Sequence, residues 1–265
     1  MSDLIKKFLL ISTLKKQVKN WTIPILFYFG IIKKEKVVEF KNGIKCIMRN
    51  KSDSIAFFEV FLLNTNDYLN EFTIKENDIV VDIGAHIGYY SIYSSEKVKN
   101  GKIFAFEPYR ESFEVLIKNL EINQIDNVIS QNMGVTENSG INTLYLKKDF
   151  SIGNSIYKNI ETDSKVEIKT ICLQDIIENN NLQRINILKL DCEGAEYEIL
   201  LNLDPQILQR IDKIVTEVHP NIKNFKINNL KEFLILNNFD VNIIQPLENT
   251  SEELAMLYAK NKEIH

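Results

Sequence analysis

Two stretches in the middle of the chain have the residue types and spacing of a nucleoside-binding site. Asp82-Ile83-Gly84-Ala85-His86-Ile87-Gly88 follows an apolar run, and its two glycines allow a sharp turn that a ligand can approach closely. Glu107 ends the next apolar run 23 positions after Gly84. This is close to the offset of about 20 residues at which an acidic side chain reaches a ribose in a βαβ unit. One carboxylate can accept hydrogen bonds from both ribose hydroxyls. The pairing of turn and carboxylate therefore predicts a bound nucleoside.

The residues of the turn distinguish between nucleosides. A dinucleotide fingerprint has glycine where this chain has His86, and Asp82 would repel the phosphates of such a ligand. An adenosine that carries a cationic sulfonium and an amino-acid tail suits the acidic turn better, which indicates S-adenosylmethionine. The alternative is a tight turn in a purely structural βαβ unit. The predicted cofactor-binding residues are Asp82, Gly84, Ala85, His86, Gly88, Glu107, Pro108 and Asp191.

A third acidic stretch, Asp191-Cys192-Glu193-Gly194-Ala195-Glu196, ends another apolar run and begins a helix. Methyl transfer is an in-line displacement, so a catalyst must align the acceptor and take the proton of a hydroxyl. Asp191 and Glu193 are candidate bases, or ligands of a hard cation such as Mg²⁺. Interaction with the helix dipole alone explains Glu196 equally well. Cys192 is interpreted as a packed residue, because methyl transfer needs no covalent intermediate.

A histidine ends a further apolar run at the same predicted edge of the sheet. His219 could act as a general base, with Glu217 two residues before it. Residues two apart on a strand share a face, so the two side chains could also simply satisfy each other. Both interpretations stay open, and we include Glu217 and His219 with Asp191 and Glu193 among the candidate catalytic residues.

The elements that must position these residues alternate along the chain. Apolar runs between turns predict parallel strands joined by helices with right-handed crossovers. The Asn42-Gly43 pair predicts a hairpin before this body, and a second hairpin is predicted at its end. The predicted strands are 37–40, 44–48, 79–83, 103–106, 128–133, 141–146, 166–171, 185–190, 214–218, 241–244 and 254–259, and the predicted helices are 89–98, 113–123, 196–203 and one around 230–234.

Three of these stretches together resemble the signature motifs of FkbM-type S-adenosylmethionine-dependent methyltransferases. They are Val80–Tyr90, Phe104–Pro108 and Leu188–Glu196, and the resemblance covers about residues 55–220. It implies an α/β fold of class I, a Rossmann-like, mostly parallel seven-stranded sheet with an antiparallel last strand. It also implies methyl transfer, usually to oxygen, on sugars, glycans or small secondary metabolites.

The resemblance also implies roles for individual residues. Asp82, Gly84 and Gly88 would line the methionine end of the cofactor, and Glu107 would hold its ribose. The family commonly has Asn where this chain has His86, and Val or Ile where it has Cys192. These departures leave the roles of the two side chains open, and a polar cap on the glycine turn is the simplest role for His86.

Composition limits the remaining possibilities. The chain has 265 residues, 45% of them hydrophobic and 26% charged, which suits one large folded body. Its net charge of −4 gives no general reason to bind nucleic acid. Three cysteines far apart in sequence favour a reducing compartment, so we expect a cytoplasmic protein.

The N-terminal part differs from the rest in charge. The first 50 residues contain ten Lys and one Arg against three acidic residues. We divide the chain into a basic amphipathic helical extension, 1–35, and a methyltransferase domain with a hairpin preamble, 36–265. The apolar run 21–32 is too short to cross a membrane, and we expect no signal peptide. The extension is expected either to contact an anionic membrane surface peripherally or to pack as a helical cap on the body.

These observations favour S-adenosylmethionine-dependent O-methylation of a sugar, glycan or other hydroxylated small molecule. One alternative is a methyltransferase for tRNA or another nucleic acid on the same fold, and another is a binding module that holds the nucleoside without turnover. The polar loop 150–165 is predicted to cover the acceptor, with Asn154 and Ser155 as candidate contacts to sugar hydroxyls beside Ser151 and Gly153. A solvated loop would have the same composition.

Overall fold

The structure is a computed structural model that describes residues 3–63, 70–147, 153–158, 162–219, 225–244 and 255–263. Its central sheet contains β3 (Ile79–Ile83), β4 (Lys102–Phe106), β5 (Val128–Gln131), β9 (Ile187–Leu190), β10 (Lys213–Val218), β11 (Phe239–Ile244) and β12 (Ala255–Asn261). The strand order is β11-β12-β10-β9-β3-β4-β5, and β12 runs antiparallel to both of its neighbours. The other pairings are parallel. The sheet confirms the predicted class I fold with an antiparallel last strand.

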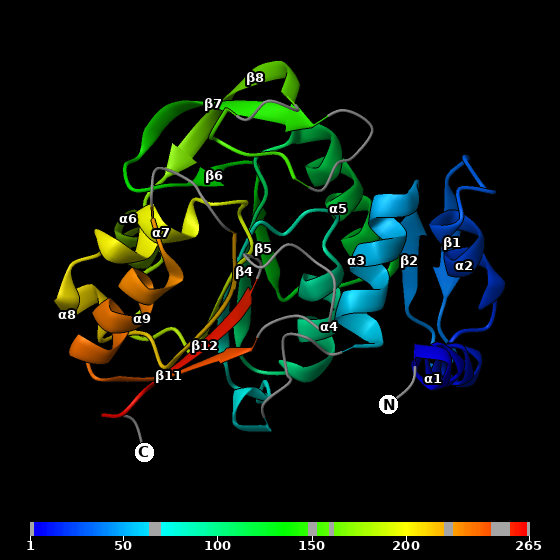
Figure 1. Ribbon diagram of the computed structural model, residues 1–265, viewed down its shortest axis with the longest axis horizontal. Helices are drawn as coiled ribbons and strands as arrows, with labels where there is room; N and C mark the ends of the chain where they lie inside the picture. The colour runs from blue at the N-terminus through cyan, green and yellow to red at the C-terminus, as the bar shows by residue number, and fades with distance from the viewer. Residues whose placement is uncertain are drawn as a thin grey trace.

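Helices cover both faces of this sheet, which explains why its inner strands are apolar on both sides. Figure 1 shows α4 (Tyr89–Lys97) and α5 (Arg110–Ile122) on one face, and α6 (Leu173–Asn179), α7 (Glu196–Leu201), α8 (Pro205–Leu208) and α9 (Ile227–Leu236) on the other. Side chains alternate between the faces: Val81 packs in the core beneath α6, α7 and α9, whereas Val80 packs with Tyr90 of α4. A short 3-10 helix, η2 (Asn70–Phe72), precedes β3.

A second, three-stranded sheet lies at one end of the main sheet. It contains β6 (Gly134–Val135), β7 (Gly140–Lys147) and β8 (Thr162–Ile171), in the order β6-β8-β7 (Figure 1). β7 and β8 are the predicted additional strands and pair antiparallel. Part of the polar loop between them, including Ser151, lies outside the described residues.

The N-terminal segment packs beside α4 and α5. It consists of α1 (Asp3–Gln17), α2 (Thr22–Tyr28), β1 (Lys36–Glu39), β2 (Lys45–Met48) and α3 (Lys51–Phe61), on the right of Figure 1. The predicted basic helix and the hairpin around Asn42-Gly43 are confirmed. Sequence reasoning missed α2 and α3, although Asn50 accepts a hydrogen bond from the Asp53 N–H and so caps the start of α3. Within the described ranges, no helix has the length and apolar character needed to span a bilayer.

The extension shares a hydrophobic core with the body. Leu14 and Val18, at the end of α1, and Phe27 of α2 are buried in one cluster with Ile87 and Leu116. The part of the extension whose side chains are described therefore packs as a cap on the body that contains the central sheet, the second of the two expected roles. The domain boundary at residues 35 and 36 stays a prediction.

Two asparagines, Asn119 in α5 and Asn123 directly after it, attach the hairpin to this body. Asn119 is buried, accepts a hydrogen bond from the Ile47 N–H (2.8 Å) and donates one to the Ile87 carbonyl (2.8 Å). Asn123, one turn later, accepts from the Lys45 N–H (2.8 Å) and donates to the Lys45 carbonyl (2.7 Å), but it is part-exposed. Asn119 thereby connects β2 to the glycine turn after β3.

We predict that Asn119→Ala lowers the free energy of unfolding by roughly 2–4 kcal/mol, because it leaves two buried backbone groups unpaired. The matched variant Asn123→Ala should cost about 1 kcal/mol or less, because water can reach the groups that it frees. Urea unfolding with linear extrapolation measures both values. Equal losses in the two variants would contradict the role assigned to Asn119.

Candidate active site

A cavity of about 280 Å³ opens at the carboxyl ends of the central strands. Its walls come from the turn after β3, the ends of β4, β9 and β10, and helix α3 of the N-terminal segment. Among its lining residues are Gly84, Ala85, His86, Glu107, Pro108, Asp191, Glu193 and Glu217, most of the residues predicted for the site. This position agrees with the rule that open α/β sheets bind ligands beyond the carboxyl ends of their strands.

The glycine turn brings β3 against the end of β9. Gly84 has a φ of +76°, and a Cβ at this position would lie 1.8 Å from the carbonyl oxygen of Asp191. Gly88 has a φ of +86° and packs against Leu116 of α5, so it supports the turn and does not line the cavity. The expectation that Gly88 lines the methionine end therefore needs revision. His86 also has positive φ, and its backbone N–H points to Glu107.

Glu107 is buried at the end of β4 and holds the turn in place. One of its carboxylate oxygens accepts the His86 N–H (2.8 Å), and the other accepts the Tyr109 N–H (2.8 Å). Burial raises the pKa of Glu107 to about 7, although the two backbone hydrogen bonds oppose this shift. Each oxygen can accept a further hydrogen bond, so the group suits a diol such as a ribose.

Asp82 is fully buried and does not line the cavity. Its Oδ2 accepts a hydrogen bond from Ser91 (2.7 Å), and its Oδ1 lies 3.3 Å from Nζ of Lys189, the residue opposite it on β9. We therefore correct the expectation that Asp82 contacts the methionine end directly. Asp82 acts on the cavity through Lys189, whose ammonium also lies 3.3 Å from the Gly84 carbonyl and 3.5 Å from Asp191 Oδ2.

Lys189 lines the cavity, and sequence reasoning missed it. Burial alone would lower the pKa of its ammonium, but Asp82 and Asp191 outweigh burial and raise the pKa above its usual value. The lysine is therefore charged at neutral pH. A lone lysine inside the apolar run 185–190 was the available signal, because a charge in a buried strand requires partners.

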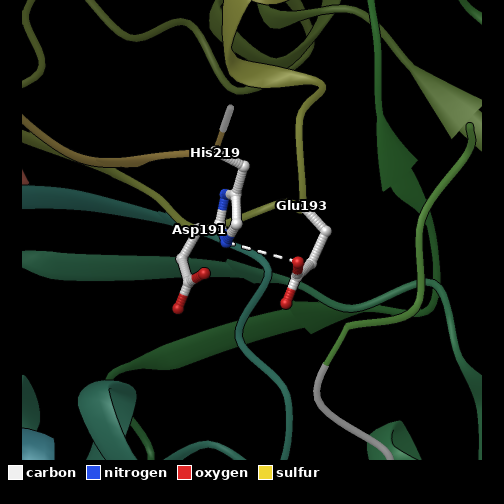
Figure 2. Close-up of side chains that lie close together, drawn as sticks. All are labelled: Asp191, Glu193 and His219. Carbon is white, nitrogen blue, oxygen red and sulfur yellow. Dashed lines mark ion pairs between the residues drawn. The ribbon is translucent and has the colours of Figure 1, made fainter. Parts of the chain in front are cut away.

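Asp191, Glu193 and His219 lie together at the rim (Figure 2). The two carboxylates flank the imidazole, and His219 Nε2 lies 3.2 Å from Glu193 Oε2. On its other side, His219 Nδ1 lies 3.0 Å from Oε1 of the buried Glu196. The suggested pairing of His219 with Glu217 is thus replaced by pairs with Glu193 and Glu196.

The turn that carries Glu193 is held in an uncommon backbone conformation. Glu193 has a φ of +52° and Gly194 a φ of +104°. Ser155 donates a hydrogen bond to the Glu193 carbonyl (2.6 Å), and Glu196 accepts the Cys192 N–H (3.0 Å). Glu196 therefore lies in the first turn of α7, where the helix dipole favours a carboxylate, and also holds the Cys192 N–H and His219.

The charges of this cluster shift each other's protonation. Burial opposes protonation of His219, but Glu196 and Glu193 raise its pKa well above the usual value, so the ring is an imidazolium at neutral pH. Burial raises the pKa of Glu193, and the His219 charge opposes that shift. Burial and Asp191 raise the pKa of Glu217 to about 8. Burial also raises the pKa of the Cys192 thiol well above its usual value, which agrees with a packed, unreactive cysteine.

Helix α3 adds an acidic residue that sequence reasoning did not find. Glu59 lines the cavity opposite the strand ends, and burial together with Asp191 raises its pKa to about 7. Its helix lies before all three signature stretches. The polar positions 50–54 signalled a helix start, but nothing local indicated that this helix would meet the strand ends.

The loop between β7 and β8 reaches the cavity from the other side. Gly153 and Asn154 line it, and Asn154 Oδ1 accepts a hydrogen bond from the Lys147 N–H (3.0 Å). The Ser155 hydroxyl donates its hydrogen bond to the Glu193 carbonyl. The structure therefore brings Asn154 to the cavity, as predicted for a contact to the acceptor, while Ser155 supports the Glu193 turn.

One ligand atom each from Asp191, Glu193 and His219 lies within 4.8 Å of the others, a spacing that could hold a metal ion. Mg²⁺ takes oxygen ligands, so the two carboxylates suit it and the imidazole does not. Both ring nitrogens of His219 are also engaged by Glu193 and Glu196. The residues present fit an ion-paired cluster better than a three-residue Mg²⁺ site.

Strand order, glycine turn and acidic strand ends together define the class I methyltransferase fold. The family model described as "Methyltransferase FkbM domain" matches residues 82–247, and the chain belongs to this family.

Curated relatives include several named methyltransferases. Methyltransferase 1 of Beauveria bassiana is 28% identical over 162 residues, which cover 54% of this chain and 65% of the relative. Hexuronic acid methyltransferase AglP of Haloferax volcanii is 28% identical over 148 residues, which cover 56% and 59%. The chain thus spans less than two thirds of the length of these two relatives.

Two solved structures match the chain at low identity and with TM-scores below 0.5. An rRNA methylase from Streptococcus thermophilus matches with a TM-score of 0.48 and 13% identity, over 75% of this chain and 94% of the other. TrmK of M. capricolum in complex with S-adenosyl-homocysteine matches with a TM-score of 0.45 and 17% identity, over 76% and 68%.

We predict that Gly84→Ala destabilises the protein far more than Gly43→Ala. Both glycines have positive φ, but only the new Cβ at Gly84 would meet backbone within 4 Å. Gly43→Ala should cost roughly 1–2 kcal/mol for the left-handed backbone. Gly84→Ala should cost at least about 2 kcal/mol more, because β3 and β9 must separate. Chemical unfolding measures the difference, and similar values for the two variants would show that the contact with Asp191 relaxes freely.

Proposed function

We propose that this protein transfers a methyl group from S-adenosylmethionine to a hydroxyl of a sugar, glycan or other small hydroxylated acceptor. One observation carries the proposal: a single cavity is lined by both Glu107, after β4, and the acidic Asp191–Glu193 turn, after β9, on either side of β3. Family membership and a relative named for a hexuronic acid support it.

A cytoplasmic location is part of the proposal and rests on the three free cysteines.

The donor half of the cavity would hold the cofactor. Glu107 would accept hydrogen bonds from the ribose hydroxyls, while Gly84, Ala85 and His86 would present backbone to the methionine part, next to Asp191. Pro108 also lines this half. When bound, the cofactor supplies a methyl group on a cationic sulfur.

The acceptor half would provide the base. In the displacement, the acceptor oxygen bonds to the methyl carbon, the carbon–sulfur bond breaks with its electrons going to sulfur, and the hydroxyl proton must leave. His219 is already protonated, so a carboxylate is the better base. Glu193 suits this role, because burial raises its pKa above that of an exposed carboxyl. His219 would then be a positioning residue that fixes Glu193, while Asp191 lies beside both (Figure 2).

The charge of the cavity indicates the kind of acceptor. Glu59, Asp191, Glu193 and Glu217 all line it. A polyphosphate backbone would meet repulsion from these groups, most strongly at a pH where Glu59 and Glu217, with pKa values of about 7 and 8, are also ionised, which disfavours the alternative of a tRNA or other nucleic-acid substrate. A hydroxylated small molecule or glycan without a row of phosphates would meet less repulsion. We therefore expect a small-molecule or glycan partner and no nucleic acid.

The proposal is tested by cofactor binding and product formation. Calorimetry should show S-adenosylmethionine binding that weakens as the pH falls below about 7, because protonated Glu107 can no longer accept both ribose hydroxyls. The Glu107→Gln variant should bind S-adenosylmethionine roughly ten- to a hundredfold more weakly at pH 8. Its affinity should no longer show the decrease below about pH 7 that is due to protonation of Glu107. Glu59 and Glu217 titrate in the same pH range. The contribution of Glu107 is therefore the difference between the pH profiles of cofactor binding for the wild type and for Glu107→Gln.

Incubation with a panel of sugars and hydroxylated metabolites should yield S-adenosylhomocysteine. Cofactor binding without any product across the panel would favour a binding module without turnover. Absence of binding with a folded protein would overturn the assignment of the donor.

For catalysis, we predict that Glu193→Gln lowers turnover by roughly 10²–10⁴ because the base is lost. His219→Ala should lower it at least about tenfold, about 1.4 kcal/mol in the barrier, while cofactor affinity stays near that of the wild type. His219→Ala should also shift the pH profile of kcat, because Glu193 loses the neighbouring cation that opposes protonation. Unchanged turnover would remove His219 from the mechanism.

A chelator separates this mechanism from a metal-assisted one. EDTA should leave the wild-type turnover unchanged if Glu193 acts as a base without a metal ion. Loss of turnover that Mg²⁺ restores would instead make Asp191 and Glu193 ligands of that ion.

A further inference from the structure

Three apolar side chains close together in sequence are exposed where α2 ends. The exposed fractions are 43% for Tyr28, 68% for Phe29 and 68% for Ile31. A single exposed apolar residue is ordinary, but three exposed apolar side chains within four residues, separated only by Gly30, are unusual on a protein surface unless something binds there. We call residues 28–36 the α2 tip.

The backbone of this tip is fixed by hydrogen bonds. The Ile31 N–H donates to the Leu26 carbonyl (2.9 Å), and the Gly30 N–H donates to the Phe27 carbonyl (2.9 Å). With Gly30 at a φ of +67°, this is a Schellman motif. The residue after the glycine usually packs back on the helix in this motif, but here Ile31 stays exposed. The motif therefore displays Phe29 and Ile31 on a turn that Phe27 anchors in the core.

Lysines surround these apolar side chains. Lys33, Lys34 and Lys36 follow directly and are exposed, with Glu35 as the single acid of the tip. From α3, the Lys51 ammonium lies 5.4 Å from the centre of the Tyr28 ring. An apolar centre with a cationic border matches the interface of a bilayer that contains anionic lipids.

We propose that the α2 tip docks this protein on an anionic membrane surface, with Phe29 and Ile31 entering the headgroup region and the lysines contacting the lipid charges. A second copy of the chain is a poorer occupant. A symmetric dimer would bring the same lysines of both copies together. This docking is independent of the proposed reaction, and it moves the expected membrane contact from α1 to the turn after α2.

Vesicle flotation of the full chain tests the proposal. The protein should float with phosphatidylcholine vesicles that contain phosphatidylglycerol, should stay in solution with phosphatidylcholine alone, and should be released at high salt. Phe29→Ser with Ile31→Ser should weaken binding at least about tenfold. Replacing Lys33, Lys34 and Lys36 by Gln should weaken it by roughly fivefold per lysine. The chain's single tryptophan, Trp21, can report lipid contact by energy transfer to a dansyl lipid.

The matched control is Ile235→Ser with Leu236→Ser. These side chains are 44% and 83% exposed at the end of α9, on the other side of the sheet (Figure 1). The control should float like the wild type, and thermal unfolding should be unchanged in every variant, which verifies folding without any need for methyl transfer.

Three results would overturn the proposal. They are no flotation of the wild type with anionic vesicles, equal loss of binding in the α9 control, and binding that is the same without anionic lipid. A dimer in solution that the Phe29 and Ile31 substitutions dissociate would assign the tip to a second copy instead.

Discussion

The ammonium group of Lys189 joins the two strands that form the floor of the site. It lies on β9 directly opposite Asp82 of β3, and it bridges Asp82, the Gly84 carbonyl and Asp191. A buried ammonium is stable only with such partners, and a buried Asp82 would be equally costly without the ammonium. The two charges therefore require each other. Together they fix the position of the glycine turn relative to the acidic turn, and so the width of the cavity between the donor and acceptor halves.

The acceptor half depends on a second set of contacts that restrain one turn. Glu193 and Gly194 both have positive φ, a conformation that costs energy for glutamate and persists only where the surroundings enforce it. Here Ser155 holds the Glu193 carbonyl, and Glu196 holds both the Cys192 N–H and His219. As a result, the carboxylates of Asp191 and Glu193 face the cavity. The imidazolium of His219 lies between Glu193 and Glu196. Such a restrained arrangement needs little reorganisation when a proton is transferred.

Much of this arrangement was predictable from local sequence. The strand and helix alternation, both hairpins, the glycine turn and Glu107 each have a short-range signal of period, spacing or turn residues. For Lys189, the lone charge in an apolar run indicates that partners are needed but not which residues they are. Glu59 and the pairing of His219 with Glu196 have no local signal that suffices. Glu59 reaches the cavity only because α3 packs on α2 and α4, and His219 meets Glu196 only because β10 lies beside β9. The burial of Asp82 against Lys189 was not predictable for the same reason, since this partner lies on a strand more than 100 residues later.

Helix α3 connects the outer surface of the N-terminal segment to the cavity. It packs against α2, whose end carries Phe29, and its own Glu59 lines the cavity. The outer side of this segment is rich in lysine, whereas the cavity that it borders is lined by carboxylates. An anionic surface attracts the lysine-rich outer side and repels the carboxylate-lined cavity. Electrostatics alone would therefore orient the chain with the basic segment toward such a surface. The charge asymmetry of the sequence thus has a geometric counterpart, because α3 has the basic surface on one side and the acidic cavity on the other.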